Sequence, residues 1–92
     1  ILLSTYYQPT IMDYTLLYYL CLDGKWYHED NFEHHVSLGK HLSKLRPIVQ
    51  MIWYPETGHS ETHDLINGRR WSLGPATLNE AKKFTYSVMY DE

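Results

Sequence analysis

The stretch Val36-Ser37-Leu38-Gly39-Lys40-His41-Leu42-Ser43-Lys44-Leu45-Arg46-Pro47 decides the expected fold of this chain. Its three leucines lie at positions 38, 42 and 45, a helical spacing that gathers them on one side. Ser37 is a favourable N-cap, and Pro47 cannot continue a helix. The stretch therefore predicts a short helix over residues 38–46 that turns polar and basic side chains away from its apolar side.

Two further helices are predicted before this stretch. Residues 11–22 are apolar on nearly all sides and follow the N-cap Thr10, which favours a central core helix that ends at the Asp23-Gly24 turn. Residues 29–36 begin with two acidic side chains, which suit the positive end of a helix, and form a short second helix. Residues 4–8 alternate weakly and predict an edge strand or an ordered arm.

After Pro47, the sequence predicts strands and one last helix. Residues 48–54 are rich in β-branched and aromatic side chains and form a strand that ends in the turn 55–58. Residues 62–66 and 69–73 flank Asn67-Gly68, the dipeptide that best suits a two-residue hairpin turn. Thr77 and Glu80 have the spacing of a capping box and open a C-terminal helix.

This order of elements is that of a winged helix-turn-helix. The predicted fold class is α+β, with three N-terminal helices, a small antiparallel sheet that forms the wing, and an extra C-terminal helix. With 92 residues, of which 43% are hydrophobic, the chain is long enough for one domain with a modest core. The expected parts are an N-terminal strand or arm over 1–9, the winged-helix core over 10–74 and the C-terminal helix over 75–92.

Four stretches carry a further likeness: Tyr14-Thr15-Leu16-Leu17-Tyr18-Tyr19-Leu20, Asp23-Gly24-Lys25, His35-Val36 and His41-Leu42-Ser43-Lys44-Leu45-Arg46. Together they resemble the DNA-binding domain of bacterial two-component response regulators. That family also begins with a leucine-rich helix, turns at a glycine and places a leucine-arginine pair late in its recognition helix. The sequence has no receiver domain, and Trp71 replaces the family's Gly-Tyr pair. The resemblance therefore implies a stand-alone winged-helix protein of the kind found in phages, plasmids and small transcription factors.

The resemblance implies that two parts of the chain contact duplex DNA. The third helix of a winged helix enters the major groove, which assigns base and phosphate contacts to Lys40, His41, Ser43, Lys44 and Arg46. The hairpin is the wing, which assigns phosphate or minor-groove contacts to Asn67, Arg69 and Arg70. We therefore expect a transcription or recombination regulator without a catalytic step. The alternative for both sets of residues is an ordinary solvated surface.

Charge is spread unevenly along the chain, whose net charge is −3. Residues 37–74 hold five basic and three acidic side chains, whereas the remainder holds three basic and eight acidic ones. Binding to phosphate depends on the local potential more than on the total charge. One face is therefore expected to meet DNA although the chain as a whole is acidic.

The nine tyrosines are more than a core of this size encloses, and exposed tyrosine favours partner interfaces. In the last helix, a homodimer seam is expected at Phe84, Tyr86, Met89 and Tyr90. The alternative is that this helix folds back on its own core. The rival function is a protein-interaction module, such as a viral inhibitor that binds a host protein through tyrosine-rich, acidic surfaces. Steep salt dependence of binding would favour DNA over that module.

Other classes of function find less support in the sequence. Of the six histidines, His59 and His63 are four residues apart but follow turn residues, so no metal site is expected, and a pH-responsive protein is a weaker third hypothesis. No phosphate loop or nucleophile motif occurs, so no enzyme activity or cofactor is expected. Cys21 predicts a buried thiol in a reducing, cytoplasmic setting. No apolar run is long enough to cross a membrane, so no membrane partner is expected.

Overall fold

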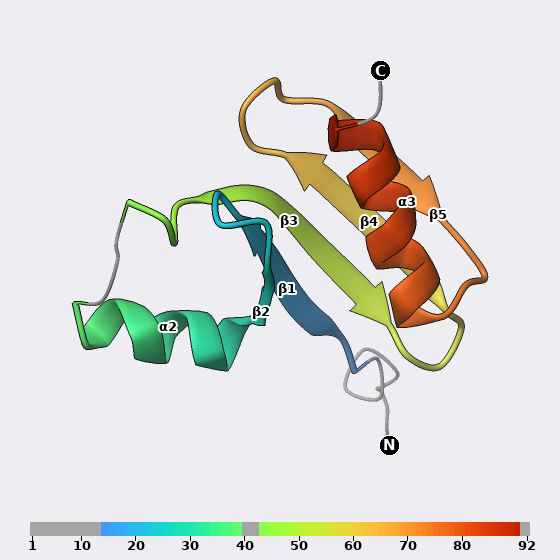
Figure 1. Ribbon diagram of the computed structural model, residues 1–92. Coiled ribbons are helices and arrows are strands. Elements are labelled where there is room, and N and C mark those ends of the chain that lie inside the picture. Colours follow the sequence, from blue (N-terminus) through green and yellow to red (C-terminus); the bar gives the residue numbers. More distant parts are fainter. Residues whose placement is uncertain (1–13, 40–42, 91–92) are drawn as a thin grey trace.

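The computed structural model describes residues 14–39 and 43–90, which form five strands and two helices (Figure 1). In chain order the elements are β1 (Leu16–Cys21), β2 (Trp26–His28), α2 (Glu29–Ser37), β3 (Pro47–Tyr54), β4 (His59–Asp64), β5 (Arg70–Leu73) and α3 (Leu78–Tyr90). The strand order is β2-β1-β3-β4-β5, and all neighbouring strands are antiparallel. The fold is therefore an α+β domain built on an antiparallel sheet, and the predicted winged helix-turn-helix with three N-terminal helices is wrong.

Most of the described residues of the predicted first helix form a strand. Residues 16–21 are β1, while residues 11–13 of the predicted helix and its N-cap, Thr10, lie outside the described residues. Both faces of β1 are covered, because Leu20 packs against α3 and Tyr19 contacts the ring of Phe32 in α2, with ring centroids 4.8 Å apart. A strand covered on both faces is apolar at nearly every position, as a buried helix is. The two structures therefore share one sequence pattern.

The predicted helix over residues 38–46 is absent from the described part of that stretch. α2 ends at Ser37, and Gly39 has a φ of +70°, the left-handed conformation that commonly ends a helix. Residues 43–45 form a turn, and β3 begins at Pro47. Leu38 is 52% exposed while Leu45 is buried, so the predicted apolar side does not form. Ser37 therefore lies in the last turn of α2 and does not cap a new helix.

The edge strand or arm predicted over residues 4–8 lies outside the described residues. The remaining predicted elements are confirmed, with one difference in the hairpin. The helix predicted over 29–36, the strand over 48–54 and the turn over 55–58 agree with α2, β3 and the β3–β4 connection. β4 and β5 pair around Asn67-Gly68, and Gly68 has the expected positive φ of +77°. The connection is a loop over residues 65–69, however, and not a two-residue turn. Within this loop, the Asp64 side chain accepts hydrogen bonds from Ile66, Asn67 and Arg69.

The register assigns each side chain to one face of the sheet, because directly opposite residues share a face. The face under α3, which we call the covered face, carries the rows Leu20–Val49–Asp64 and Tyr18–Met51–Thr62–Trp71. The register between β1 and β3 shifts between Leu20 and Cys21, which leaves Ile48 as an extra residue on β3. Ile48 thereby joins Leu20 and Val49 in the buried core.

α3 is held on the covered face by three contacts with β1, β2 and the turn between them. The Tyr86 hydroxyl donates a hydrogen bond to the Gly24 carbonyl, and its ring meets Trp26 edge-on with centroids 6.3 Å apart. The Lys82 ammonium lies 5.0 Å from the centroid of the Tyr18 ring, and burial lowers the pKa of this lysine.

α2 contacts the opposite face and lies at the β2 end of the sheet, away from β4 and β5 (Figure 1).

The predicted capping box at the start of α3 is confirmed. The Thr77 N–H donates to Glu80 Oε1 at 2.9 Å, and the Glu80 N–H donates to Thr77 Oγ1 at 3.1 Å. Each side chain therefore satisfies a backbone N–H that the helix leaves without a partner.

Replacing the capping threonine is expected to weaken the fold. Thr77→Ala removes the acceptor for the Glu80 N–H and should lower the free energy of unfolding by about 1 kcal/mol. Urea denaturation followed by circular dichroism measures the loss. Ser87→Ala, on the exposed side of the same helix, is the control and should be nearly neutral. Equal losses in the two variants would contradict a capping role for Thr77.

Candidate functional site

The face opposite α3 is covered only near β2 by the elements that the structure describes. There, α2 lies against β1 and β2 through ring contacts of Phe32 with Tyr19 and of His35 with Tyr27. No described element lies over the same face of β3, β4 and β5 (Figure 1). We call this uncovered area the open patch, and its side chains are those of Gln50, Ile52, Glu61, His63, Arg70 and Ser72.

The open patch consists of two rows that cross three strands. Gln50, His63 and Arg70 lie opposite one another in one row, and Ile52, Glu61 and Ser72 form the next. The side chains enclose a shallow hollow of about 290 Å³. Ile52 is half-buried in it, whereas Glu61, Arg70 and Ser72 are exposed. The patch thus combines one apolar contact with charges of both signs and several hydrogen-bonding groups.

Among the six side chains of the open patch, none is a nucleophile hydrogen-bonded to a base. Ser72 bears the only hydroxyl on the six side chains of the patch, and it forms no hydrogen bond with His63 or with any other residue of 14–39 and 43–90. A serine nucleophile needs a base within hydrogen-bonding distance, and this one has none in the described structure. A half-buried apolar side chain bordered on one side by polar ones is instead the composition of a contact surface.

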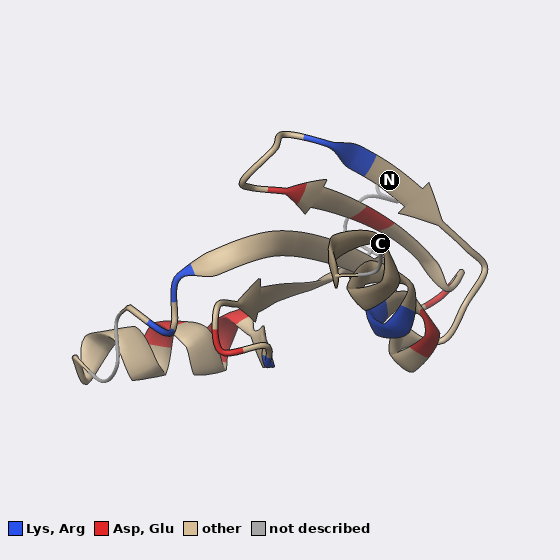
Figure 2. Ribbon diagram, turned by 45° about the horizontal axis from the view of Figure 1, so that its top comes forward, with Lys and Arg blue, Asp and Glu red and all other residues tan. Residues whose placement is uncertain are grey.

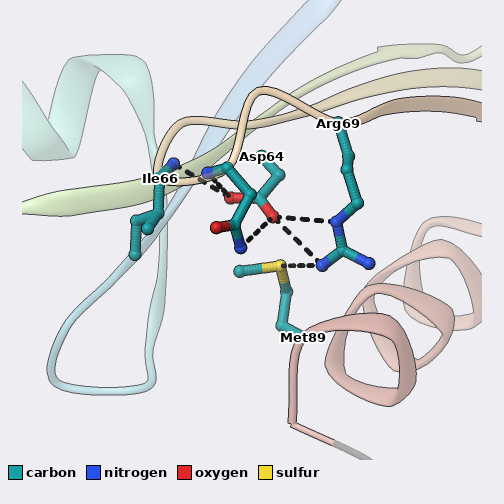
Figure 3. Close-up of polar contacts among 5 residues, drawn as sticks. Asp64, Ile66, Arg69 and Met89 are labelled. Carbon is teal, nitrogen blue, oxygen red and sulfur yellow. Dashed lines mark hydrogen bonds and ion pairs between the residues drawn. The ribbon is translucent and has the colours of Figure 1, made fainter.

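Asp64 is the most strongly bound charged group among the described residues (Figure 3). Its side chain is fully buried and accepts hydrogen bonds from the N–H groups of Ile66 and Asn67, at 2.9 and 3.1 Å, and from the Asn67 amide. Arg69 donates to the same carboxylate from Nε and Nη2, and its Nη2 also lies 4.0 Å from the Met89 sulfur. Burial alone would raise the pKa of Asp64, but these hydrogen bonds outweigh burial and lower it.

The described residues among those predicted to bind DNA do not form one surface. Lys40 and His41 lie outside the described residues. Ser43, Lys44 and Arg46 are exposed in the connection to β3, and Arg70 begins β5. Asn67 and Arg69 lie in the β4–β5 loop, where both bind Asp64. In Figure 2 the basic positions lie apart, before β3, at the start of β5 and on α3, and acidic positions alternate with them.

The four residues of the predicted dimer seam divide into two pairs. Tyr86 and Met89 are half-buried and pack against the chain's own core, as the alternative interpretation of this helix expected. Phe84 and Tyr90 are 41% and 49% exposed. Tyr90 also stacks on Tyr86, with ring centroids 5.9 Å apart. Half of the predicted seam therefore serves the core of the monomer.

Three further findings concern Cys21, Trp71 and the two described helices. Cys21 is fully buried, as predicted, and burial together with nearby Asp23 raises the pKa of its thiol to about 11. Trp71 is half-buried on the covered face, where it lies opposite Thr62 of β4. Neither of the described helices is long and apolar enough to cross a membrane.

The sequence analysis missed five of the six residues in the open patch, all except Arg70. In β3, Gln50 and Ile52 alternate in burial with Val49 and Met51, but only Gln50 is polar, so the sequence itself carries no clear period-two signal there. In β4 the buried positions are themselves polar: Ser60, Thr62 and Asp64. Alternation of apolar and polar residues therefore gave no indication that Glu61 and His63 face outward.

The chain was compared with protein-family models, with curated proteins and with solved structures. None of the three comparisons gave a match.

Proposed function

We propose that this chain is a protein-binding module and that a segment of the partner protein occupies the open patch. The observation that carries the proposal is the hollow on the sheet face that α2 leaves uncovered. Protein interfaces combine a desolvated apolar part with a polar rim. In the patch, Ile52 lies on β3 beside Leu17 of β1, and hydrogen-bonding side chains lie on its β4 and β5 side. The partner segment is expected to place an apolar side chain on Ile52.

The distribution of charge supports a protein partner over duplex DNA. DNA binding requires several cations that face the phosphates together. Arg69 is paired with the buried Asp64 at 3.1 Å, and Arg70 shares the open patch with Glu61. The helix that would have entered the major groove is absent from its described residues. Contacts of the remaining basic residues with duplex DNA stay a prediction. Because the open patch carries charges of both signs, it suits a partner segment with both acidic and basic groups.

The test uses random-sequence peptides displayed on phage and selected on the intact chain. Peptides that survive selection are measured by fluorescence anisotropy against the wild type, Ile52→Lys and Asn79→Lys. Ile52→Lys places a charge in the hollow and should weaken binding about tenfold or more. Asn79→Lys adds the same charge on exposed α3 and should leave binding unchanged.

Two outcomes would overturn the proposed function. Either no peptide survives selection, or the selected peptides bind the two lysine variants equally. A mixed-sequence DNA duplex is titrated alongside at two salt concentrations. Micromolar binding of that duplex, falling steeply with salt, would favour the nucleic-acid hypothesis instead.

A further inference from the structure

β5 is the last strand on its side of the sheet within the described residues. The Asp64 N–H donates to the Arg69 carbonyl at 2.8 Å, which makes these two residues a hydrogen-bonded pair. In an antiparallel ladder, hydrogen-bonded and non-hydrogen-bonded pairs alternate. Arg70 and Ser72, opposite His63 and Glu61, therefore belong to non-hydrogen-bonded pairs. Their own N–H and C=O groups point away from β4, toward the free edge.

This edge has some of the features that commonly keep a sheet from pairing with another chain, because β5 is short and carries Arg70. It has no proline, lysine or bulge, which are the other common features. β5 has the sequence Arg-Trp-Ser-Leu and pairs with β4 in an unbroken register. Its outward backbone groups are therefore geometrically ready to pair with a further strand.

β5 is complementary to a second copy of itself. If two β5 strands pair antiparallel with Trp71 facing Trp71 of the second copy, Arg70 lies opposite Ser72 of that copy. The outward backbone groups of Arg70 and Ser72 in both copies then find partners. Trp71 is half-buried on the covered face, and the two indole rings meet at the two-fold axis. Pairing thus covers exposed aromatic surface as well as backbone.

The same register brings opposite charges together across the junction. Glu61 lies opposite Ser72, so Glu61 of the second copy is two strand spacings from Arg70, about 9.6 Å between Cα atoms. Ser72 is short and leaves room for the arginine to extend over it. Arg70 is exposed and forms no ion pair with any residue of 14–39 and 43–90. Each junction therefore contains two Arg70–Glu61 pairs, related by the symmetry axis.

We propose that two copies of this chain join edge to edge through β5 and form one continuous antiparallel sheet, with Arg70 of each copy paired to Glu61 of the other. The proposal goes beyond the proposed peptide binding and does not depend on it. Because β5 is short, the contact is small, and dissociation is expected at micromolar concentrations. The two open patches then lie side by side on one face of the dimer.

Sedimentation equilibrium of the intact chain over a range of concentrations tests the proposal. Arg70→Glu and Glu61→Arg should each weaken dimerisation about tenfold or more, because each places like charges across the junction. An equimolar mixture of the two variants should dimerise like the wild type, since both pairs are then of opposite charge. Lys83→Glu, on exposed α3, makes the same change of charge and should have no effect.

Amide hydrogen exchange provides a second measurement that does not rely on variants. The amides of Arg70 and Ser72 should exchange more slowly as the protein concentration rises, because pairing encloses them. Ser72→Pro removes one outward N–H without removing a hydrogen bond to β4, and it should abolish dimerisation. The proposal is overturned if the chain stays monomeric at every concentration. It is also overturned if a dimer persists in both charge variants and leaves these two amides unprotected.

Discussion

Asp64→Ala is expected to lower the free energy of unfolding by about 3 kcal/mol, because the buried carboxylate organises the whole β4–β5 loop. Its removal leaves the N–H groups of Ile66 and Asn67 without their acceptor and takes the partner from Arg69. Arg69→Ala should cost much less, about 1 kcal/mol, since the arginine side chain is 52% exposed while that of Asp64 is fully buried. Urea denaturation of both variants at neutral pH measures the difference.

The same carboxylate makes stability depend on pH. The pKa of Asp64 is lower in the folded state than in the unfolded state, so its contribution is complete above the unfolded pKa of about 4. That contribution is lost as the pH falls through the folded pKa. The wild type should therefore lose more stability between pH 7 and about pH 3 than Asp64→Asn does. Identical pH dependence in the two proteins would show that the Asp64 hydrogen bonds do not lower its pKa.

Leu20→Ala is expected to cost about 3 kcal/mol, because Leu20 is completely buried between Ile48, Val49 and the side chains of α3. The loss combines the transfer of the removed atoms to water with the cavity that remains. Leu22→Ala provides a matched control two residues away, since Leu22 is 53% exposed and should cost less than about 0.5 kcal/mol. The urea midpoints of the two variants measure both losses. Similar losses would contradict the assignment of Leu20 to the buried side of the sheet.

Local signals in the sequence predict most of the second half of the fold. The capping box, the β3 strand and the Asn67-Gly68 hairpin depend on neighbours within a few residues, and all three are present. The errors fall where tertiary context decides. The apolar run of β1 suits a buried helix as well as a strand covered on both faces. The leucine spacing after Ser37 suits a helix, but Gly39 adopts a left-handed conformation there.

The open patch was harder to predict than the fold, because it is assembled across strands. Gln50, His63 and Arg70 become neighbours only through the register of three strands, and one sequence does not specify a register. The full burial of the Asp64 carboxylate further obscures the alternation of buried and exposed positions along β4. A charged residue in a short polar segment is ordinarily read as exposed, and this one is buried because the loop supplies its hydrogen-bond donors.

α2 is attached differently from the rest of the molecule. It contains no buried residue, and its ring contacts with the sheet are those of Phe32 and His35. α3, by contrast, buries Ala81 and Thr85 and closes over the core. Resistance to opening follows the amount of buried contact, so the two helices differ in the free energy needed to detach them. We therefore expect heat or denaturant to detach α2 first, while β3 and β4 keep their hydrogen bonds until the whole domain unfolds.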